Sequence, residues 1–320
     1  MKRSVEQALE RYAQSGAGAF GEYLAQRANL RTKLETLIHA EKGSVALAAN
    51  TSRGVSDIAL SIPWRAGDRA LVFTGEFPAN IAPWQQAAEL FELKLVWQDS
   101  RRFLERPSAA LEDVERELKQ GIRLVAVSAV QFQTGLCMPL QQLGDLCQRY
   151  GAELCVDAIQ ACGVVPVDVA QSHIHYLACG GHKWLMGMEG SGFVYVEPQC
   201  ASKLHPRVAG WMSCEEPEDF LFGPGLLRYD KPLRKSALAF ETGTLSVLGF
   251  AALEAGLDLI LSLGVPKILE HVTAYLDALE PQLVVRGFQS LRGKDESARS
   301  GILSLVPPAG HDAASLRAKL

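Results

Sequence analysis

Short apolar runs alternate with helix-patterned segments between residues 44 and 196 of this 320-residue chain, and this alternation limits the possible fold more than any other feature. The apolar runs of strand length cover residues 44–49, 69–74, 94–97, 124–130, 153–156, 176–179 and 191–196. Apolar positions with helical spacing fill residues 55–62, 81–91, 109–119 and 139–150. This order predicts an α/β fold with a mainly parallel mixed sheet, covered by helices on both faces.

The pattern changes near residue 245, where two long helices are expected at 245–263 and 265–279. A strand-like run at 301–306 and a helical run at 313–320 follow. Because 320 residues are many for one domain, we expect two. Residues 1–245 would form N-terminal helices and a large domain, and residues 246–320 a small, partial α+β domain. The Pro/Gly-rich stretch 222–232 predicts a surface loop.

Composition excludes several classes of function. With 48% hydrophobic residues, 21% charged residues and a net charge of −4, the chain offers no electrostatic case for binding nucleic acid or a membrane. No apolar run approaches the ~18 residues that span a bilayer, and the N-terminus lacks an apolar signal core, so we predict a cytoplasmic protein. Seven cysteines without regular spacing indicate buried thiols in a reducing compartment.

One lysine and one aspartate follow two of the predicted strands. Lys183 lies between the run at 176–179 and a glycine-rich turn at 187–192, so we expect its amine to enter a pocket where desolvation frees a nucleophile. Asp157 ends the run at 153–156, and a buried carboxylate needs a cationic partner. A protonated pyridine nitrogen is such a partner, which suggests pyridoxal 5'-phosphate with Lys183 as Schiff base. A surface lysine and a turn aspartate are the ordinary alternatives.

A phosphate site is predicted where the first strand runs into a helix through Asn50-Thr51-Ser52-Arg53-Gly54. Thr51 and Ser52 then fall at the helix N-terminus, where unpaired N–H groups and the helix dipole attract an anion. Both residue types are also ordinary helix caps without any ligand. We favour the phosphate site because ligands of open α/β sheets collect at the carboxyl ends of strands, where Lys183 and Asp157 are also expected.

Five motifs, taken together and in order, resemble the class V aminotransferase family, which includes cysteine desulfurases and kynureninase among the fold type I enzymes. The motifs are Asn50-Thr51-Ser52-Arg53-Gly54, Glu76-Phe77-Pro78-Ala79-Asn80-Ile81-Ala82-Pro83-Trp84, Asp157-Ala158-Ile159-Gln160, His182-Lys183 and Phe240-Glu241-Thr242-Gly243-Thr244. The resemblance runs from about residue 44 to residue 249 and implies further segments at both ends, so the chain looks shortened. It also implies a substrate-carboxylate arginine, and none of the late arginines sits in a matching motif: Arg286, Arg292, Arg299 and Arg317.

The resemblance implies roles for three more residues. Gln160 would hydrogen-bond the ring hydroxyl of the cofactor, and His182 would donate to its phosphate, with a core histidine as the alternative. Thr244 would reach across a two-fold axis to the phosphate of the partner chain, which implies a homodimer with shared active sites. Its alternative is the N-cap of a helix beginning near residue 245. Where the family often has a serine two residues before the histidine, this chain has Gly180, so one hydroxyl contact is expected to be missing.

Ala129 departs from the cysteine desulfurase pattern. Those enzymes carry at this position a histidine that stacks on the cofactor ring and moves protons, and alanine can do neither. The segment Val130-Gln131-Phe132-Gln133-Thr134-Gly135 instead resembles the kynureninase version, in which an aromatic side chain covers the ring. Phe132 is therefore the candidate for stacking, with a plain core aromatic as the alternative.

The predicted function is that of a pyridoxal-phosphate enzyme acting on an amino acid or amine. Transamination is the first expectation, because the desulfurase histidine is absent. One alternative is a lyase of the cysteine desulfurase, selenocysteine lyase or kynureninase type. Another is a non-catalytic or truncated protein that keeps the cofactor fold without the substrate-carboxylate arginine. The sequence does not identify the substrate.

Two further patterns are rejected as functional sites. Gly16-Ala17-Gly18-Ala19-Phe20-Gly21 matches the dinucleotide fingerprint, but it follows a helical pattern at 5–14 where a strand is required, so we expect a break between two helices. The set His173, His175, Cys179 and His182 has residue types that bind zinc. Its spacing matches no familiar closed site, and we predict no metal.

Overall fold

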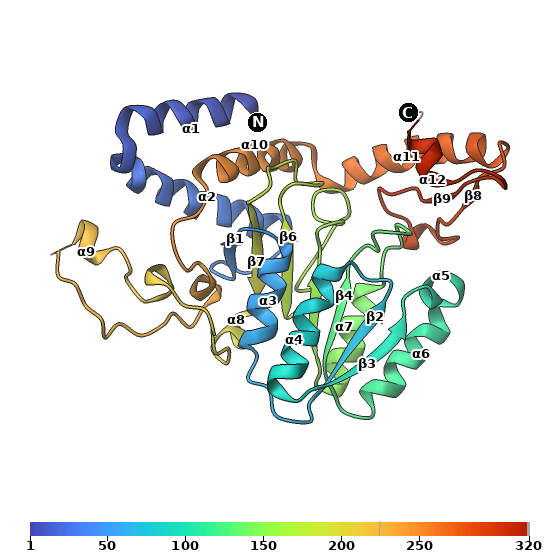
Figure 1. The fold of residues 1–320 in the computed structure, drawn as a ribbon, viewed down its shortest axis with the longest axis horizontal. Helices are drawn as coiled ribbons and strands as arrows, with labels where there is room; N and C mark the ends of the chain where they lie inside the picture. Colours follow the sequence, from blue (N-terminus) through green and yellow to red (C-terminus); the bar gives the residue numbers. More distant parts are fainter. Residues whose placement is uncertain (224, 319–320) are drawn as a thin grey trace.

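A seven-stranded mixed sheet forms the centre of the computed structural model, which describes residues 1–223 and 225–318 (Figure 1). Its strand order is β1-β7-β6-β5-β4-β2-β3. The strands are β1 (Val45–Ala48), β2 (Arg69–Thr74), β3 (Lys94–Asp99), β4 (Ile122–Ser128), β5 (Glu153–Asp157), β6 (Tyr176–Gly180) and β7 (Gly192–Val196). Because β7 alone runs antiparallel to its neighbours, the other six strands end at one shared carboxyl edge.

The predicted alternation of strands and helices is confirmed. Every predicted run contains a strand, and β2 has the predicted bounds. Among the strands of the central sheet the largest difference is in β4, which begins at Ile122 and ends at Ser128, whereas the prediction covered residues 124–130. Beyond Ser128 the pairing changes: Ala129 still donates its N–H to the carbonyl of Asp157, but Val130 forms an isolated antiparallel bridge with Cys137.

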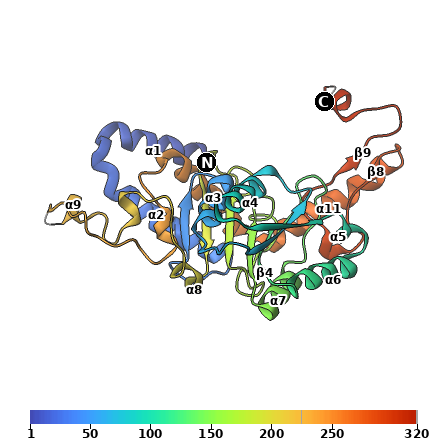
Figure 2. The ribbon, with the colours of Figure 1, turned by 60° about the horizontal axis from the view of Figure 1, so that its bottom comes forward.

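Helices cover both faces of the sheet, as predicted (Figure 2). One face is covered by α3 (Thr51–Ser61) and α4 (Ala82–Phe91). The other is covered by α2 (Phe20–Leu37), α6 (Pro107–Leu118), α7 (Leu140–Tyr150) and α10 (Val247–Leu263). Along β4, Leu124 and Ala126 pack toward the first layer and Val125 and Val127 toward the second, which is the alternation of a strand buried on both sides.

Helix α3 lies unusually close to the sheet because of Gly54. A Cβ atom on Gly54 would stand 2.5 Å from Cγ1 of Val194 and 2.9 Å from Cβ of Ala178. A glycine inside a helix costs about 1 kcal/mol relative to alanine, but here any side chain would push α3 away from β6 and β7. The close approach places the N-terminus of α3 at the carboxyl edge of the sheet.

The glycine fingerprint joins two helices, as expected. Helix α1 (Lys2–Ser15) ends at Gly16, the 3₁₀ turn η1 (Gly16–Ala19) follows, and α2 begins at Phe20. No strand precedes these glycines in the part of the chain that the structure describes. Helix α1 packs against α10 (Figure 1).

The remaining elements lie at the margins of the sheet. Short helices are α5 (Arg102–Glu105), α8 (Pro198–Ala201) and α9 (Asp219–Phe222). The other 3₁₀ turns are η2 (Pro78–Asn80), η3 (Trp211–Ser213), η4 (Ala237–Phe240) and η5 (Glu296–Ala298). The predicted surface loop at 222–232 has exposed side chains wherever it is described, except for the half-buried Lys231; residue 224 lies outside the described residues.

After α10 the chain leaves the sheet through α11 (Val265–Val284), of which Leu276 alone is buried. Strands β8 (Gln289–Ser290) and β9 (Leu305–Val306) pair antiparallel, so the predicted strand at 301–306 is shorter than expected. Helix α12 (Ala313–Arg317) occupies the predicted helical run, whose last two residues lie outside the described part. The division at residues 245 and 246 stays a prediction. Within the described residues no single helix has the length and apolarity to cross a bilayer, and α10 and α11 qualify only as a pair bent by 83°.

Candidate active site

The carboxyl edge of the sheet brings together the residues that the sequence placed at separate strand ends. Strand β5 ends at Asp157, β6 ends at Gly180 just before Lys183, and α3 begins at Thr51 directly after β1. In the strand register, Asp157 lies opposite Ala178 of β6 on one side and Ser128 of β4 on the other. Adjacent parallel strands therefore hold this edge in one fixed arrangement.

Asp157 is a buried carboxylate, with 2% of its surface exposed. Its Oδ1 accepts a hydrogen bond from the N–H of Ile159 at 3.0 Å, and no hydrogen bond among the described residues reaches Oδ2. Burial raises the pKa of Asp157 to about 7; the N–H of Ile159 opposes this shift, the charge of Glu76 adds to it and the charge of Lys183 opposes it. Such a carboxylate is stabilised in its charged form by a cationic N–H donor.

Lys183 is half-buried and pairs with no carboxylate among the described residues. Its Nζ lies 5.9 Å from the centroid of the Phe77 ring, within the range of a cation–π contact. A tight turn holds the backbone beside it, because Met186 donates to the carbonyl of Lys183 and Gly187 to that of Gly181. The amine therefore faces an aromatic ring and has no acidic partner.

The start of α3, where a phosphate site is predicted, has Asn50, Thr51 and Ser52 at the helix N-terminus. Asn50 is the helix cap, since its Oδ1 accepts from the N–H of Arg53 at 2.8 Å, so the alternative that Thr51 or Ser52 serves only as the cap is wrong. Ser52 is exposed, whereas Thr51 is buried and its Oγ1 accepts the N–H of Gly180 at 2.9 Å. The hydroxyl hydrogen of Thr51 and the first backbone N–H groups of α3 remain as donors.

The contact between Thr51 and Gly180 depends on the missing side chain at position 180. A Cβ atom on Gly180 would lie 3.2 Å from Oγ1 of Thr51, 3.2 Å from Cε1 of His182 and 3.1 Å from Cδ1 of Ile159. These spacings are tight, so a serine would require its neighbours to move. The packing around position 180 therefore favours the glycine of this chain over the serine that the family often has.

Glu76 and Gln131 link the loops that follow β2 and β4. Glu76 is buried and accepts hydrogen bonds from the N–H of Ser128 at 2.8 Å, from Nε2 of Gln131 at 2.7 Å and from the hydroxyl of Ser128. The next residues along the two loops, Phe77 and Phe132, meet edge to face, with ring centroids 5.3 Å apart and planes at 85°. The predicted stacking residue Phe132 thus belongs to a pair, and Phe77 is the member in contact with Lys183.

The motif containing Glu76 and Phe77 carried the family resemblance, but sequence reasoning assigned neither residue a role. An acidic residue directly after an apolar strand was the available signal for Glu76, because a buried carboxylate must find donors. No local signal pointed to Phe77. Its contact with Lys183 joins residues more than a hundred positions apart.

Gln160 and His182 flank the same edge and make no side-chain hydrogen bond among the described residues. Gln160 is half-buried and His182 is exposed. The alternative of a core histidine is therefore wrong for His182. Both side chains stay available for the ligand contacts that the resemblance implies.

The loop carrying Thr244 is held from two sides. Glu241 is buried and accepts from the N–H of Leu47 at 2.8 Å and from Nη1 of Arg31 at 3.0 Å. Nη2 of Arg27 donates to the carbonyl of Leu245 at 2.8 Å. Thr244 between these anchors is exposed. The alternative that Thr244 is the N-cap of the following helix is wrong, because Ser246 caps α10 by accepting from the N–H of Gly249.

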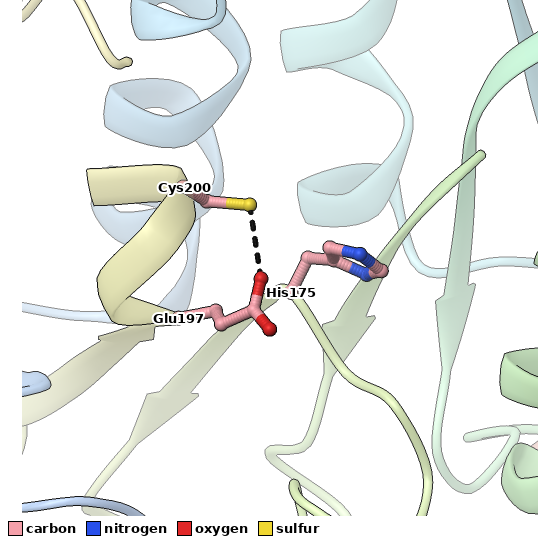
Figure 3. Close-up of side chains that lie close together, drawn as sticks. All are labelled: His175, Glu197 and Cys200. Carbon is pink, nitrogen blue, oxygen red and sulfur yellow. Dashed lines mark hydrogen bonds between the residues drawn. The ribbon is translucent and has the colours of Figure 1, made fainter. Parts of the chain in front are cut away.

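A second cluster of polar side chains lies at the opposite edge of the sheet, where His175 precedes β6, Glu197 follows β7 and Cys200 lies on α8 (Figure 3). Their ligand-type atoms lie within 4.8 Å of one another, and Sγ of Cys200 donates to Oε2 of Glu197 at 3.2 Å. Nδ1 of His175 accepts the N–H of Leu154 at 3.0 Å, which leaves the ring proton on Nε2. With Nδ1 occupied and Nε2 protonated, neither ring nitrogen of His175 has a free lone pair for a metal in this arrangement.

The sheet order and the lysine at its carboxyl edge define an α/β protein of fold type I. The chain belongs to the aminotransferase class-V family, whose model matches residues 5–319. A probable cysteine desulfurase of Pyrococcus abyssi is 30% identical over 297 residues, which cover 89% of this chain and 69% of that protein. Across similar curated relatives, the chain spans between 57% and 69% of their length.

Solved structures share the fold. A cysteine desulfurase from Thermococcus onnurineus NA1 is 24% identical with a TM-score of 0.84, and the match covers 99% of this chain and 79% of that one. The cystine C–S lyase C-DES, in complex with its product cysteine persulfide, is 21% identical with a TM-score of 0.88, covering 99% and 83%. Another C-DES structure has glycine covalently linked to its PLP cofactor. At these identities the likeness shows the fold alone.

Proposed function

We propose that this protein is a pyridoxal-phosphate enzyme that cleaves the C–S bond of a sulfur-containing amino acid. The observation that carries the proposal is the pairing, at one sheet edge, of Lys183 without an acidic partner and the buried Asp157 with an open Oδ2. The relatives favour C–S lyase chemistry over the transamination expected from the sequence, because several are probable cysteine desulfurases. Transamination becomes the second candidate, supported by Ala129 at the desulfurase histidine position.

The residues at the edge fit pyridoxal 5'-phosphate. Oδ2 of Asp157 would take the ring nitrogen, the N-terminus of α3 with Thr51 and Ser52 the phosphate, and Lys183 the aldehyde carbon. Gln160 and His182 have side chains free to join this shell. When bound, the cofactor withdraws electrons from the bonds at the substrate Cα.

The chain's own residues then supply proton transfer and positioning. Asp157 would hold the protonated ring nitrogen, because Oδ2 of this buried carboxylate has no partner among the described residues and a cationic N–H donor would stabilise its charged form. The Lys183 amine takes the proton from the substrate Cα, and the sulfur leaves Cβ with the bonding electron pair. Phe77 and Phe132 would form an apolar surface beside the Lys183 amine and reduce the access of water there.

Two of the described cysteines, Cys179 and Cys137, are poorly suited to capture the sulfur, which supports its release from the protein. Cys179, next to Gly180, is buried, and its Sγ is directed at the carbonyls of Ala158 and Gly180. Cys137 is partly exposed, but burial raises its pKa to about 12, so it is a thiol at neutral pH. Since the thiolate is the nucleophile, neither suits sulfur transfer.

The test supplies the purified protein with pyridoxal 5'-phosphate and either L-cysteine or L-cystine. Equal amounts of pyruvate and released sulfide or persulfide support elimination. Alanine with sulfur bound to the protein would refute release, and a 2-oxo acid that retains the sulfur would establish transamination. Borohydride reduction followed by mass spectrometry should place phosphopyridoxyl on Lys183, and Lys183→Ala should lose both label and turnover. Lys94→Ala, at an exposed lysine, is the control.

We also propose that the protein forms a homodimer in which the two chains share their active sites. Its proposed location is the cytoplasm. Thr244 supports the shared sites, because this exposed hydroxyl stands on a loop anchored by Glu241 and Arg27. A threonine held in this way can meet an anion on a second chain. The small domain at 246–320 is likewise proposed as a separate unit.

A further inference from the structure

We infer that Phe77 selects the substrate by its side chain, favouring an uncharged, sulfur-bearing or apolar group over a carboxylate. The inference rests on the proposed function and deepens it. Phe77 is 48% exposed although it is a large apolar residue, and its ring faces Nζ of Lys183 at 5.9 Å. The substrate must come to this amine, so its side chain comes within reach of the ring.

Phe77 is held by its neighbours on both sides along the chain. Before it, Glu76 is fixed by Gln131 and Ser128. After it, the carbonyl of Phe77 accepts the N–H of Asn80 at 2.8 Å, and Oδ1 of the buried Asn80 accepts Nε1 of Trp84 at 3.2 Å. The exposed ring therefore extends from a rigid backbone, which is the property a selecting surface requires.

Phe132 completes an aromatic wall. Its ring meets that of Phe77 edge to face at 5.3 Å, and Phe132 is half-buried. The Glu76–Gln131 hydrogen bond fixes the spacing of the two rings, because each ring follows directly after one of these residues. The two rings therefore act as one surface beside Lys183.

The chemistry of this surface separates substrates by charge. Sulfur and apolar groups make favourable contacts with aromatic rings. A carboxylate that leaves water to lie against the two rings loses its hydration and gains no hydrogen bond from them. Thioether and disulfide side chains are neutral and fit, whereas an aspartate-like side chain does not.

The test compares S-methyl-L-cysteine with L-aspartate, two amino acids of similar size. Dissociation constants come from the change in cofactor absorbance before turnover. We expect the wild type to bind S-methyl-L-cysteine more tightly, Phe77→Ser to reduce this preference about tenfold, and Phe77→Tyr to keep it. Trp97→Ser, at an aromatic residue 44% exposed on the edge strand β3, should leave the preference unchanged. An unchanged ratio in Phe77→Ser, or a wild-type preference for aspartate, overturns the inference.

A second measurement needs no cofactor. Reductive methylation with ¹³C-formaldehyde labels the lysines of the cofactor-free protein, and Lys183→Arg identifies the Lys183 signal. We expect ring-current displacement of this signal in the wild type and its loss in Phe77→Leu, which keeps an apolar side chain if Phe77→Ser does not fold. No displacement in the wild type overturns the contact. Failure of the Lys183 label in the borohydride experiment would instead refute the proposed function, so the two failures are distinguishable.

Discussion

Nε2 of Gln131 donates a hydrogen bond to Oε1 of Glu76 at 2.7 Å, in a buried position between the ends of β2 and β4. The two residues are 55 positions apart in the chain. Because each is followed by a phenylalanine, the contact also determines how the two rings meet beside Lys183. The buried Glu76–Gln131 hydrogen bond thus positions the two phenylalanine rings beside Lys183.

Glu76→Ala should destabilise the protein by about 3 kcal/mol, because it leaves the N–H of Ser128 and the amide of Gln131 buried without an acceptor. Urea unfolding measures the change in the free energy of unfolding. Glu89→Ala removes an exposed acid on α4 and should change it by less than about 0.5 kcal/mol. Equal effects of the two substitutions would show that Glu76 does not hold the loops together.

The cofactor-free protein should lose stability as pH rises from about 4 to about 7, because the folded state keeps a proton on Asp157 that the unfolded chain releases. The raised pKa of about 7 corresponds to a total loss of roughly 4 kcal/mol, of which roughly 3 kcal/mol falls above about pH 5, with no further loss beyond about pH 8. Unfolding by urea at about pH 5 and about pH 8 measures it. Asp157→Asn should flatten this dependence, whereas Asp295→Asn, at an exposed site, should not. A wild-type profile as flat as that of Asp157→Asn contradicts the prediction.

Phe132→Ala should weaken binding of pyridoxal 5'-phosphate by about 1 kcal/mol or more, since the substitution removes an aromatic contact. Equilibrium titration of the cofactor-free protein measures the dissociation constant. Trp97→Ala serves as the control for removing an exposed ring. If cofactor affinity and spectrum are the same in Phe132→Ala and the wild type, another residue covers the cofactor ring.

Mixing Lys183→Ala with Thr244→Ala should restore part of the activity that each variant alone lacks. In the mixed dimer one shared site carries both substitutions and the other carries neither. Activity is measured after the two variants have exchanged subunits. In the control experiment Thr32→Ala, which changes an exposed threonine of α2, takes the place of Thr244→Ala. A monomer that holds cofactor, or two inactive dimeric parents that show no recovery, would mean that Thr244 acts within its own chain or not at all.

The secondary structure and the sheet edge at which the site lies could be predicted from the amino-acid pattern alone. Whether a strand is buried on one or both faces appears in the spacing of its apolar residues, so β2 and the helices of both layers could be predicted. Parallel strands end at a common edge, which is why Asp157 and Lys183 could be placed together from their positions after apolar runs.

Which side chains meet became known only from the folded chain. The Glu76–Gln131 bond, the Phe77–Lys183 contact and the acceptance of the Gly180 N–H by Thr51 all join segments that are distant in the chain. Local periodicity carries no information on such pairs, because they depend on strand register and on the path of the loops after each strand. The N-cap of α10 is likewise Ser246 and not Thr244, the alternative that the sequence left open, and a hydrogen bond from the distant Arg27 to the Leu245 carbonyl anchors the chain just before this cap.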